Sequence, residues 1–104
     1  MQNVSKIACA NNGGFVMRFR IRWKEGKETK SSKWSGKYPI DQAKTMDLSK
    51  LNIPEGTEVW PEADAMLGKQ KDAREHVVYK PDTENVATYR VYGTTYHIKI
   101  DLLN

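Results

Sequence analysis

The sequence predicts an all-β protein, a compact antiparallel β-sandwich formed by a single domain over residues 1–104. Apolar and polar residues alternate along several segments, which is the pattern of strands with one buried face. Gly, Pro, Asn and Asp separate these segments at short intervals, and helical periodicity is weak. About seven or eight short strands in a chain of this length are typical of a sandwich or a small barrel.

The first strand is predicted at Val4–Ala10. It is followed by Asn11–Gly14, whose residues tolerate positive φ and predict a tight hairpin. The second strand, Phe15–Trp23, has the clearest alternation in the chain. Its apolar odd-numbered residues predict a core-facing side. The opposite side, predicted to be the wet face of the sheet, carries Arg18, Arg20 and Arg22.

Weaker patterns fill the middle of the chain. Lys24–Lys27 is predicted to turn the second strand, and a weak strand follows at Lys30–Trp34. Ser35–Ala43 is predicted to be a loop, Lys44–Leu48 a short strand and Asn52–Gly56 a turn.

A longer strand is predicted at Thr57–Leu67. Pro61 interrupts it, and because proline lacks an N–H group we expect this strand at a sheet edge or in a bulge. The overlapping segment Glu62–His76 is rich in helix-forming residues, so a helical turn is the alternative there.

The C-terminal third is predicted to contain three strands. Glu75–Tyr79 is the first, and the loop Lys80–Asn85 follows it. Val86–Tyr92 and Thr95–Leu103 are predicted to form a final hairpin around Gly93.

The charge pattern argues against a nucleic-acid-binding block, and the single cysteine excludes a disulfide-stabilised domain. Seventeen Lys and Arg against thirteen Asp and Glu give a net charge of +4, but the charges are mixed along the chain and do not form a nucleic-acid-binding block. Cys9 excludes an intramolecular disulfide, and we expect it to be a buried, unreactive strand residue.

No segment has the length of a membrane span, and no secretory signal peptide is recognisable. From the residues alone, the expected location is cytoplasmic unless the protein was processed or leaves by another route. The sequon at Asn3 is then expected to be unused.

Catalytic and metal-binding patterns are missing from the sequence. His76 and His97 have no metal-ligand spacing, and no nucleophile or phosphate-loop motif is present, so we expect no enzyme and no cofactor. Acidic loops such as the one with Asp82 and Glu84 leave calcium as a minor alternative.

Aromatic residues near loops favour sugar binding. A flat ring can cover the apolar face of a pyranose, while carboxylates and amides bond its hydroxyl groups. Trp34 and Tyr38 are the predicted stacking platforms, and Trp60 is a further candidate. The predicted hydroxyl-binding residues are Asn11, Asn12, Asp41 and Asp64.

The three arginines of the second strand support other hypotheses. If they lie near a binding loop, Arg18, Arg20 and Arg22 would favour acidic glycans such as sialylated ones. The alternative function is a basic module that binds nucleic acid or another polyanion through them, although the aromatic residues of that strand face the other way. A structural or protein-interaction domain that offers a sheet edge is a third hypothesis.

Four segments together resemble the small haemagglutinins of the plasmodial slime mould Physarum. The resemblance covers essentially the whole chain and is carried by NNGGFVMRFRIRW, KWSGKYPIDQAKTMDL, IPEGTEVWPEADAMLGK and YRVYGTTYHIKI. It implies a non-enzymatic lectin with a sandwich similar to those of legume lectins and galectins, but smaller. It also implies glycans of glycoproteins as partners and an extracellular or cell-surface location.

Agglutination requires at least two binding sites per particle, so the resemblance implies a homodimer or two sites per chain. The acidic metal-binding loop of legume lectins has no counterpart in this sequence, so metal is not expected. No sugar-binding residue can be carried over by position.

Overall fold

The structure of the protein is a computed structural model that describes residues 1–104, and it confirms the all-β class. Strands are joined by turns and loops, with one short 3-10 helix, η1 (Leu48–Lys50), and no α-helix. The strands are β1 (Asn3–Val4), β2 (Lys6–Asn11), β3 (Met17–Glu25), β4 (Glu28–Ser31), β5 (Ala43–Asp47), β6 (Glu58–Ala65), β7 (Gln70–Asp72), β8 (Val77–Tyr79), β9 (Val86–Thr94) and β10 (His97–Leu102). A membrane-spanning helix is absent, since the single helical segment, η1, has three residues.

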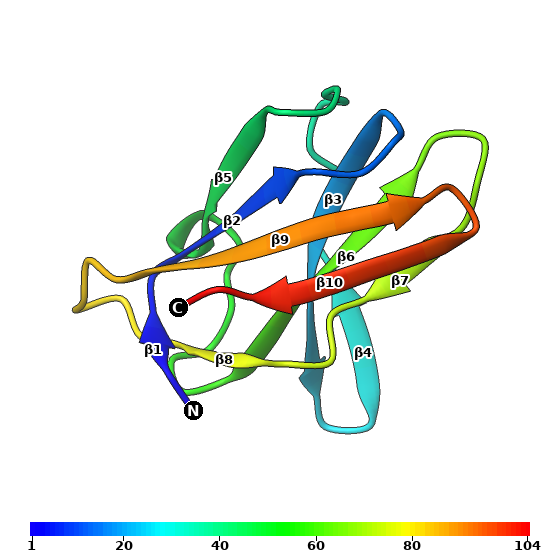
Figure 1. The fold of residues 1–104 in the computed structure, drawn as a ribbon. Helices are drawn as coiled ribbons and strands as arrows, with labels where there is room; N and C mark the ends of the chain where they lie inside the picture. The colour runs from blue at the N-terminus through cyan, green and yellow to red at the C-terminus, as the bar shows by residue number, and fades with distance from the viewer.

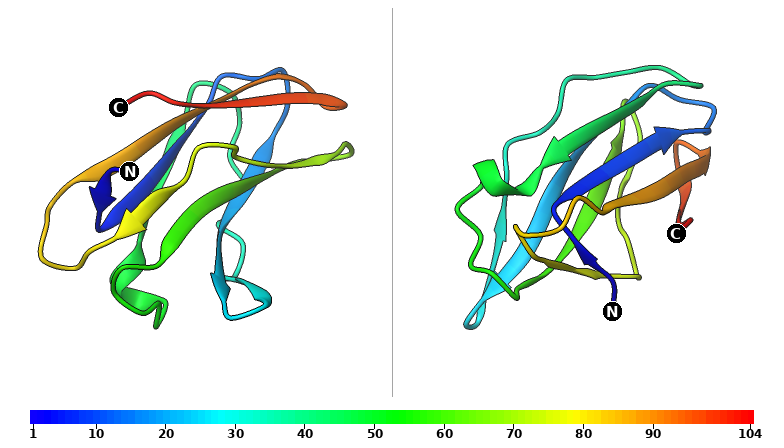
Figure 2. Two further views of the ribbon diagram at one scale, coloured as in Figure 1. Left: turned by 90° about the horizontal axis from the view of Figure 1, so that it is seen from below. Right: turned by 90° about the vertical axis from the view of Figure 1, so that its left-hand side faces the viewer.

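The strands form two sheets packed as the layers of a sandwich (Figures 1 and 2). The six-stranded sheet has the order β1-β8-β6-β3-β4, with β7 also paired to β6, and the four-stranded sheet has the order β10-β9-β2-β5. The sheets are mixed rather than antiparallel throughout, because β1 is parallel to β8 and β2 is parallel to β9. Parallel neighbours need a long connection, and most of the chain separates each of these pairs.

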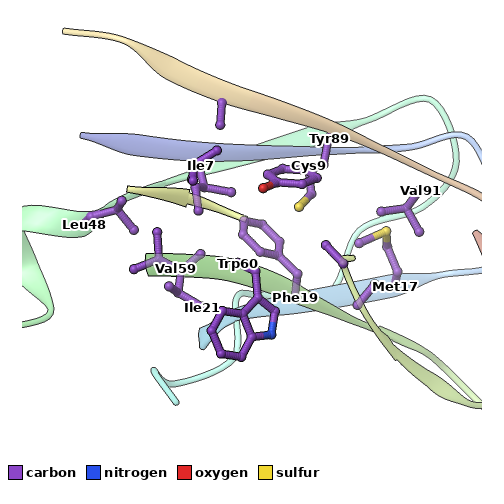
Figure 3. Packing of buried hydrophobic residues seen from close by; sticks show 14 of the residues in the cluster. Ile7, Cys9, Met17, Phe19, Ile21, Leu48, Val59, Trp60, Tyr89 and Val91 are labelled. Carbon is purple, nitrogen blue, oxygen red and sulfur yellow. The ribbon is translucent and has the colours of Figure 1, made fainter. Parts of the chain in front are cut away.

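The core lies between the two sheets (Figure 3). The alternation in β3 places its odd-numbered residues inside, as predicted, and β2 and β9 supply the opposite layer. Cys9 is a free and fully buried member of that layer, also as predicted. The labelled core residues of these three strands are Ile7, Cys9, Met17, Phe19, Ile21, Tyr89 and Val91.

Asn11–Gly14 does not form the predicted hairpin. β2 and β3 belong to different sheets, so this segment crosses from one layer to the other. The tight path requires Gly13, since a Cβ there would lie 2.3 Å from the Phe15 ring. Turn-forming residues were recognised correctly, but they do not specify whether the chain returns within the same sheet.

The prediction that Pro61 marks a sheet edge is wrong, because β6 lies inside its sheet between β3 and the pair β7 and β8. The ladder is nevertheless interrupted beside Pro61, where neither β7 nor β8 pairs with it. Ile21, the partner of Pro61 in register, directs its N–H and C=O groups to Ser32 instead. The proline nitrogen therefore faces the gap between β7 and β8, where no ladder bond is lost. There the Pro61 carbonyl accepts from the Ala73 N–H (2.9 Å).

The predicted strands near the C-terminus are confirmed, and the Glu62–His76 segment forms strands and turns without a helix. The last hairpin turns at Thr95–Tyr96, because Thr94 pairs with His97. Gly93 lies within β9 at a φ of 101°, and a Cβ there would lie 2.2 Å from the His97 carbonyl oxygen. Glycine is therefore required beside the turn rather than in it.

Candidate functional site

The outer face of the six-stranded sheet carries two facing rows of side chains from β3 and β6. The inward residues of both strands fill the core, so the alternate residues must point outward. In register the rows pair Arg18 with Asp64, Arg20 with Glu62, and Arg22 with Trp60. We call these six residues, together with Trp34 and Asp72, the outer-face array.

The arginines of the array are fixed by carboxylates. Arg18 Nε lies 2.8 Å from Asp64 Oδ2, and Arg20 Nε lies 2.6 Å from Glu62 Oε1. Both carboxylates are buried, with relative exposures of 7% and 6%. Arg22 Nη1 lies 3.4 Å from Asp72 Oδ2 and 3.8 Å from Glu62 Oε2. Three arginines thus face three carboxylates, and the array is close to electrically neutral.

Trp34 lies against two of these arginines. The guanidinium carbons of Arg18 and Arg20 are 4.5 and 4.3 Å from the centre of its ring, within cation–π range. The segment that carries Trp34 follows β4 and is tied to β3 at Ser32 and Ser35, whose hydroxyl groups accept from backbone N–H groups of β3. The indole is half-buried, so part of its surface stays open to solvent.

Trp60 occupies the end of the array next to Arg22. Figure 3 shows its indole on the side of β6 that faces away from Ile7 and Cys9. Its ring stacks on His76, with centroids 4.2 Å apart and an angle of 11° between the planes. The stack borders a hollow of about 290 Å3, also lined by Lys24, Thr57 and Glu58. The His76 stack leaves Trp60 only 7% exposed, so it is a covered member of the site.

Tyr38 and Asn11 are structural residues, and the roles predicted for them need correction. Tyr38 is 1% exposed, packs edge-on against Phe19 and donates its hydroxyl group to the Cys9 carbonyl at 2.8 Å, so no sugar can stack on it. Asn11 is fully buried. Its amide group donates to the carbonyls of Phe15 (2.8 Å) and Tyr38 (3.2 Å), and its oxygen accepts from the Gly13 N–H.

Asn12 and Asp41 are exposed, but they lie near the crossover and outside the array. The Asn12 amide oxygen accepts from Arg90 Nε at 3.3 Å. The Asp41 N–H donates to the Asn11 carbonyl, and its backbone has a positive φ of 70°. The structure therefore gathers Trp34, Trp60, Asp64 and the three arginines, and separates them from the other predicted residues.

Glu62 and Asp72 were not among the predicted site residues. Glu62 alternates with apolar neighbours as Asp64 does, and opposite charges on facing strands pair across a sheet. That complementarity between β3 and β6 was the available signal. Asp72 and His76 lie outside β3 and β6, and only the tertiary structure brings them next to the array. No sequence pattern predicted their position.

The carboxylates and histidines do not assemble into a metal site. No group of three or more His, Cys, Asp or Glu side chains is arranged to hold a metal ion. The acidic residues of the array instead face guanidinium groups.

Known proteins resemble this chain in fold but not in sequence. No protein-family model matches the sequence, and neither does any curated protein. Among solved structures, pneumolysin aligns with 94% of this chain at 16% identity and a TM-score of 0.50, over 23% of its own length. A Gram-negative toxin aligns with 95% of this chain at 16% identity and a TM-score of 0.51, over 22% of its length. The chain thus spans less than a quarter of either toxin, and the likeness is one of fold.

Proposed function

We propose that the protein is a non-enzymatic carbohydrate-binding protein, a lectin, whose glycan site is the outer-face array. The observation that carries this proposal is the position of Trp34 on Arg18 and Arg20, whose guanidinium groups are held by Asp64 and Glu62. The resemblance to small haemagglutinins supports the same function, with glycoproteins outside the cell or at its surface as partners.

The array offers the two kinds of contact that a sugar needs. An indole surface covers the apolar C–H face of a pyranose. The arginines can donate, and the Asp72 carboxylate, whose side chain is 48% exposed, can accept, so both hydrogen-bonding roles of a sugar hydroxyl are available. Asp64 and Glu62 are buried and serve to fix the arginines. Hydrogen bonds to charged groups contribute about 1.5–3 kcal/mol each, and groups already fixed by ion pairs lose little entropy on binding.

Nucleic-acid binding through the three arginines is less favoured by the same geometry. Arg18, Arg20 and Arg22 are each paired with a carboxylate, so the array presents little net charge to a phosphate backbone. A polyanion site there would lose affinity steeply between about 50 and 200 mM salt. Glycan binding by an internally neutral array is expected to change little over this range.

A glycan array probed with the wild type and Trp34→Ala tests the proposal. We expect the wild type to bind at least one class of glycan and the variant to lose tenfold or more, since a lost ring contact of about 1.4 kcal/mol has this effect. Asn12→Ala is the control, because Asn12 is exposed and lies outside the array. Thermal unfolding checks that each variant is folded.

Two results would overturn the assignment. If the wild type binds no glycan above background, the function is wrong. If it binds and Trp34→Ala binds equally well, the function stands but the site lies elsewhere.

A further inference from the structure

β7 and β10 lie side by side at the edges of the two sheets (Figures 1 and 2). A second polar hollow lies between them. Its volume is about 480 Å3. β10 is the end strand of its sheet and β7 pairs only with β6, so both walls are strand edges. We call this hollow the basic groove, after Lys69, Lys71, His97 and Lys99 that line it.

Two turns hold the groove together at one end. The turn before β7 contacts the turn before β10, where the Lys69 N–H donates to the Thr95 carbonyl at 2.8 Å. A Cβ at Gly68 would lie 2.3 Å from the same carbonyl oxygen, so the turns are in close contact. This contact fixes the position of Lys69 relative to the start of β10.

The lysines of the groove have no carboxylate partner, unlike the arginines of the outer-face array, although Lys99 Nζ lies 6.0 Å from the centre of the Tyr92 ring. Lys69, Lys71 and Lys99 form no ion pair, and no carboxylate lines the hollow. Lysine amines that share a concave surface without acids raise the local concentration of anions. The groove is therefore an unneutralised cationic surface within a chain that otherwise mixes its charges.

The stretch of the groove that is free of carboxylates is short. The adjoining hollow of about 290 Å3 shares Lys71 and Lys99 with the groove and adds Arg74, but it also contains Asp72 and Asp101. On that side the cations are therefore interspersed with carboxylates. A continuous phosphate backbone would run onto these acids, whereas a compact ligand with one or two anionic groups would not. Gln70 and the Tyr96 ring, 59% exposed, add neutral hydrogen bonding and an apolar surface.

We propose that the basic groove is a second binding site, specific for an acidic saccharide whose sulfate or carboxylate groups contact the three lysines. The anion preference follows from the groove alone, while the choice of a saccharide rests on the proposed function. Two separate sites on one chain would also supply the valency that agglutination requires without a dimer.

Calorimetric titration with a fully sulfated heparin disaccharide, and with the same disaccharide without sulfate, tests the proposal. The groove variant combines Lys69→Gln, Lys71→Gln and Lys99→Gln. A charge-matched control combines Lys27→Gln, Lys37→Gln and Lys50→Gln, at lysines that are exposed and form no ion pair. We expect the wild type and the control to bind only the sulfated form, and the groove variant to bind it about tenfold or more weakly.

Equal binding by the groove variant, or an equal loss in the control, would overturn the proposal. Inorganic sulfate and a short single-stranded oligonucleotide are titrated in parallel. If either binds the groove as tightly as the disaccharide does, the saccharide assignment is wrong. Trp34→Ala tests whether the two sites are independent, because we expect it to leave the binding of the sulfated disaccharide unchanged. This result does not depend on whether the outer-face array binds a glycan.

Discussion

At the scale of single residues, Asn11 shows how a polar side chain can organise a fold without joining a binding site. It lies where the chain leaves one sheet and enters the other. β2 and β3 share no ladder of backbone hydrogen bonds. The Asn11 side chain instead makes three hydrogen bonds to the backbone of the crossing segment and of Tyr38. A buried amide in this position satisfies backbone groups that would otherwise be unpaired.

We expect Asn11→Ala to lower the free energy of unfolding by about 3 kcal/mol, because it leaves the Phe15 carbonyl and the Gly13 N–H without partners. The Tyr38 carbonyl keeps its bond from the Met17 N–H. Urea unfolding measures this change. Its neighbour Asn12 is the matched control, since Asn12→Ala removes an exposed side chain and is expected to change stability by less than about 0.5 kcal/mol. Similar effects of the two substitutions would contradict the structural role of Asn11.

Alkaline pH tests the buried titratable groups. Burial raises the pKa of the Cys9 thiol well above its ordinary value of 9.0, and burial also raises the pKa of the Tyr38 and Tyr89 hydroxyls. Above about pH 9 the unfolded chain releases the Cys9 proton while the folded protein keeps it. Stability is therefore complete below this pH and falls above it, by about 1.4 kcal/mol per pH unit for Cys9.

Cys9→Ala is expected to make this fall shallower by about 1 kcal/mol between about pH 9 and pH 10, in unfolding curves recorded at each pH. Comparing slopes separates the titration from any loss of packing, which is independent of pH. Parallel slopes in the variant and the wild type would show that the thiol does not contribute.

At the scale of elements, β3 was predicted accurately because its pattern is local. Alternation decides which side chains of a strand share a face. Once one face is buried in the core, the other must lie on the outer side of the sheet. The same reasoning failed at Asn11–Gly14 and at Pro61, where the outcome depends on the neighbouring strands. Asn and Gly permit a turn in either case, and a proline is tolerated inside a sheet when its nitrogen faces a gap between partners.

The last hairpin provides a test at this scale. We expect Gly93→Ala to lower stability by about 3 kcal/mol or more, since the new Cβ would meet the His97 carbonyl oxygen at a positive φ. Gly26→Ala is the control: Gly26 also has a positive φ, of 63°, but its Cβ would have open space. We expect about 1 kcal/mol there. Chemical unfolding compares the two, and equal losses would contradict the close approach of β9 and β10.

At the scale of the whole molecule, the register between β3 and β6 decides which predicted residues can act together. Trp34 and Tyr38 look alike in the sequence, since both are aromatic residues near a predicted loop. The fold places Trp34 on the outer face and Tyr38 inside the core. The distinction depends on how the segment after β4 lies beside β3, which no local pattern reports. The ion pairs of the array could likewise not be predicted without knowing that β3 and β6 are neighbouring strands.

The molecule also separates its positive charges into two kinds of surface. The arginines on the outer face are neutralised by facing carboxylates, whereas the lysines of the basic groove have no acidic partner. The net charge of +4 is a sum over the whole chain and does not report this difference between the two surfaces. Neutral and acidic glycans would accordingly bind at different places on one small domain.

The most direct test of the central proposal, that the outer-face array binds glycans, is a nitrogen-15 NMR titration with the best neutral ligand from the glycan array. We expect the indole N–H signal of Trp34 and the Nε–H signals of Arg18 and Arg20 to shift together, while the amide signals of Asn11 and Asn12 stay in place. Shifts confined to the crossover or to any surface other than the array would contradict it.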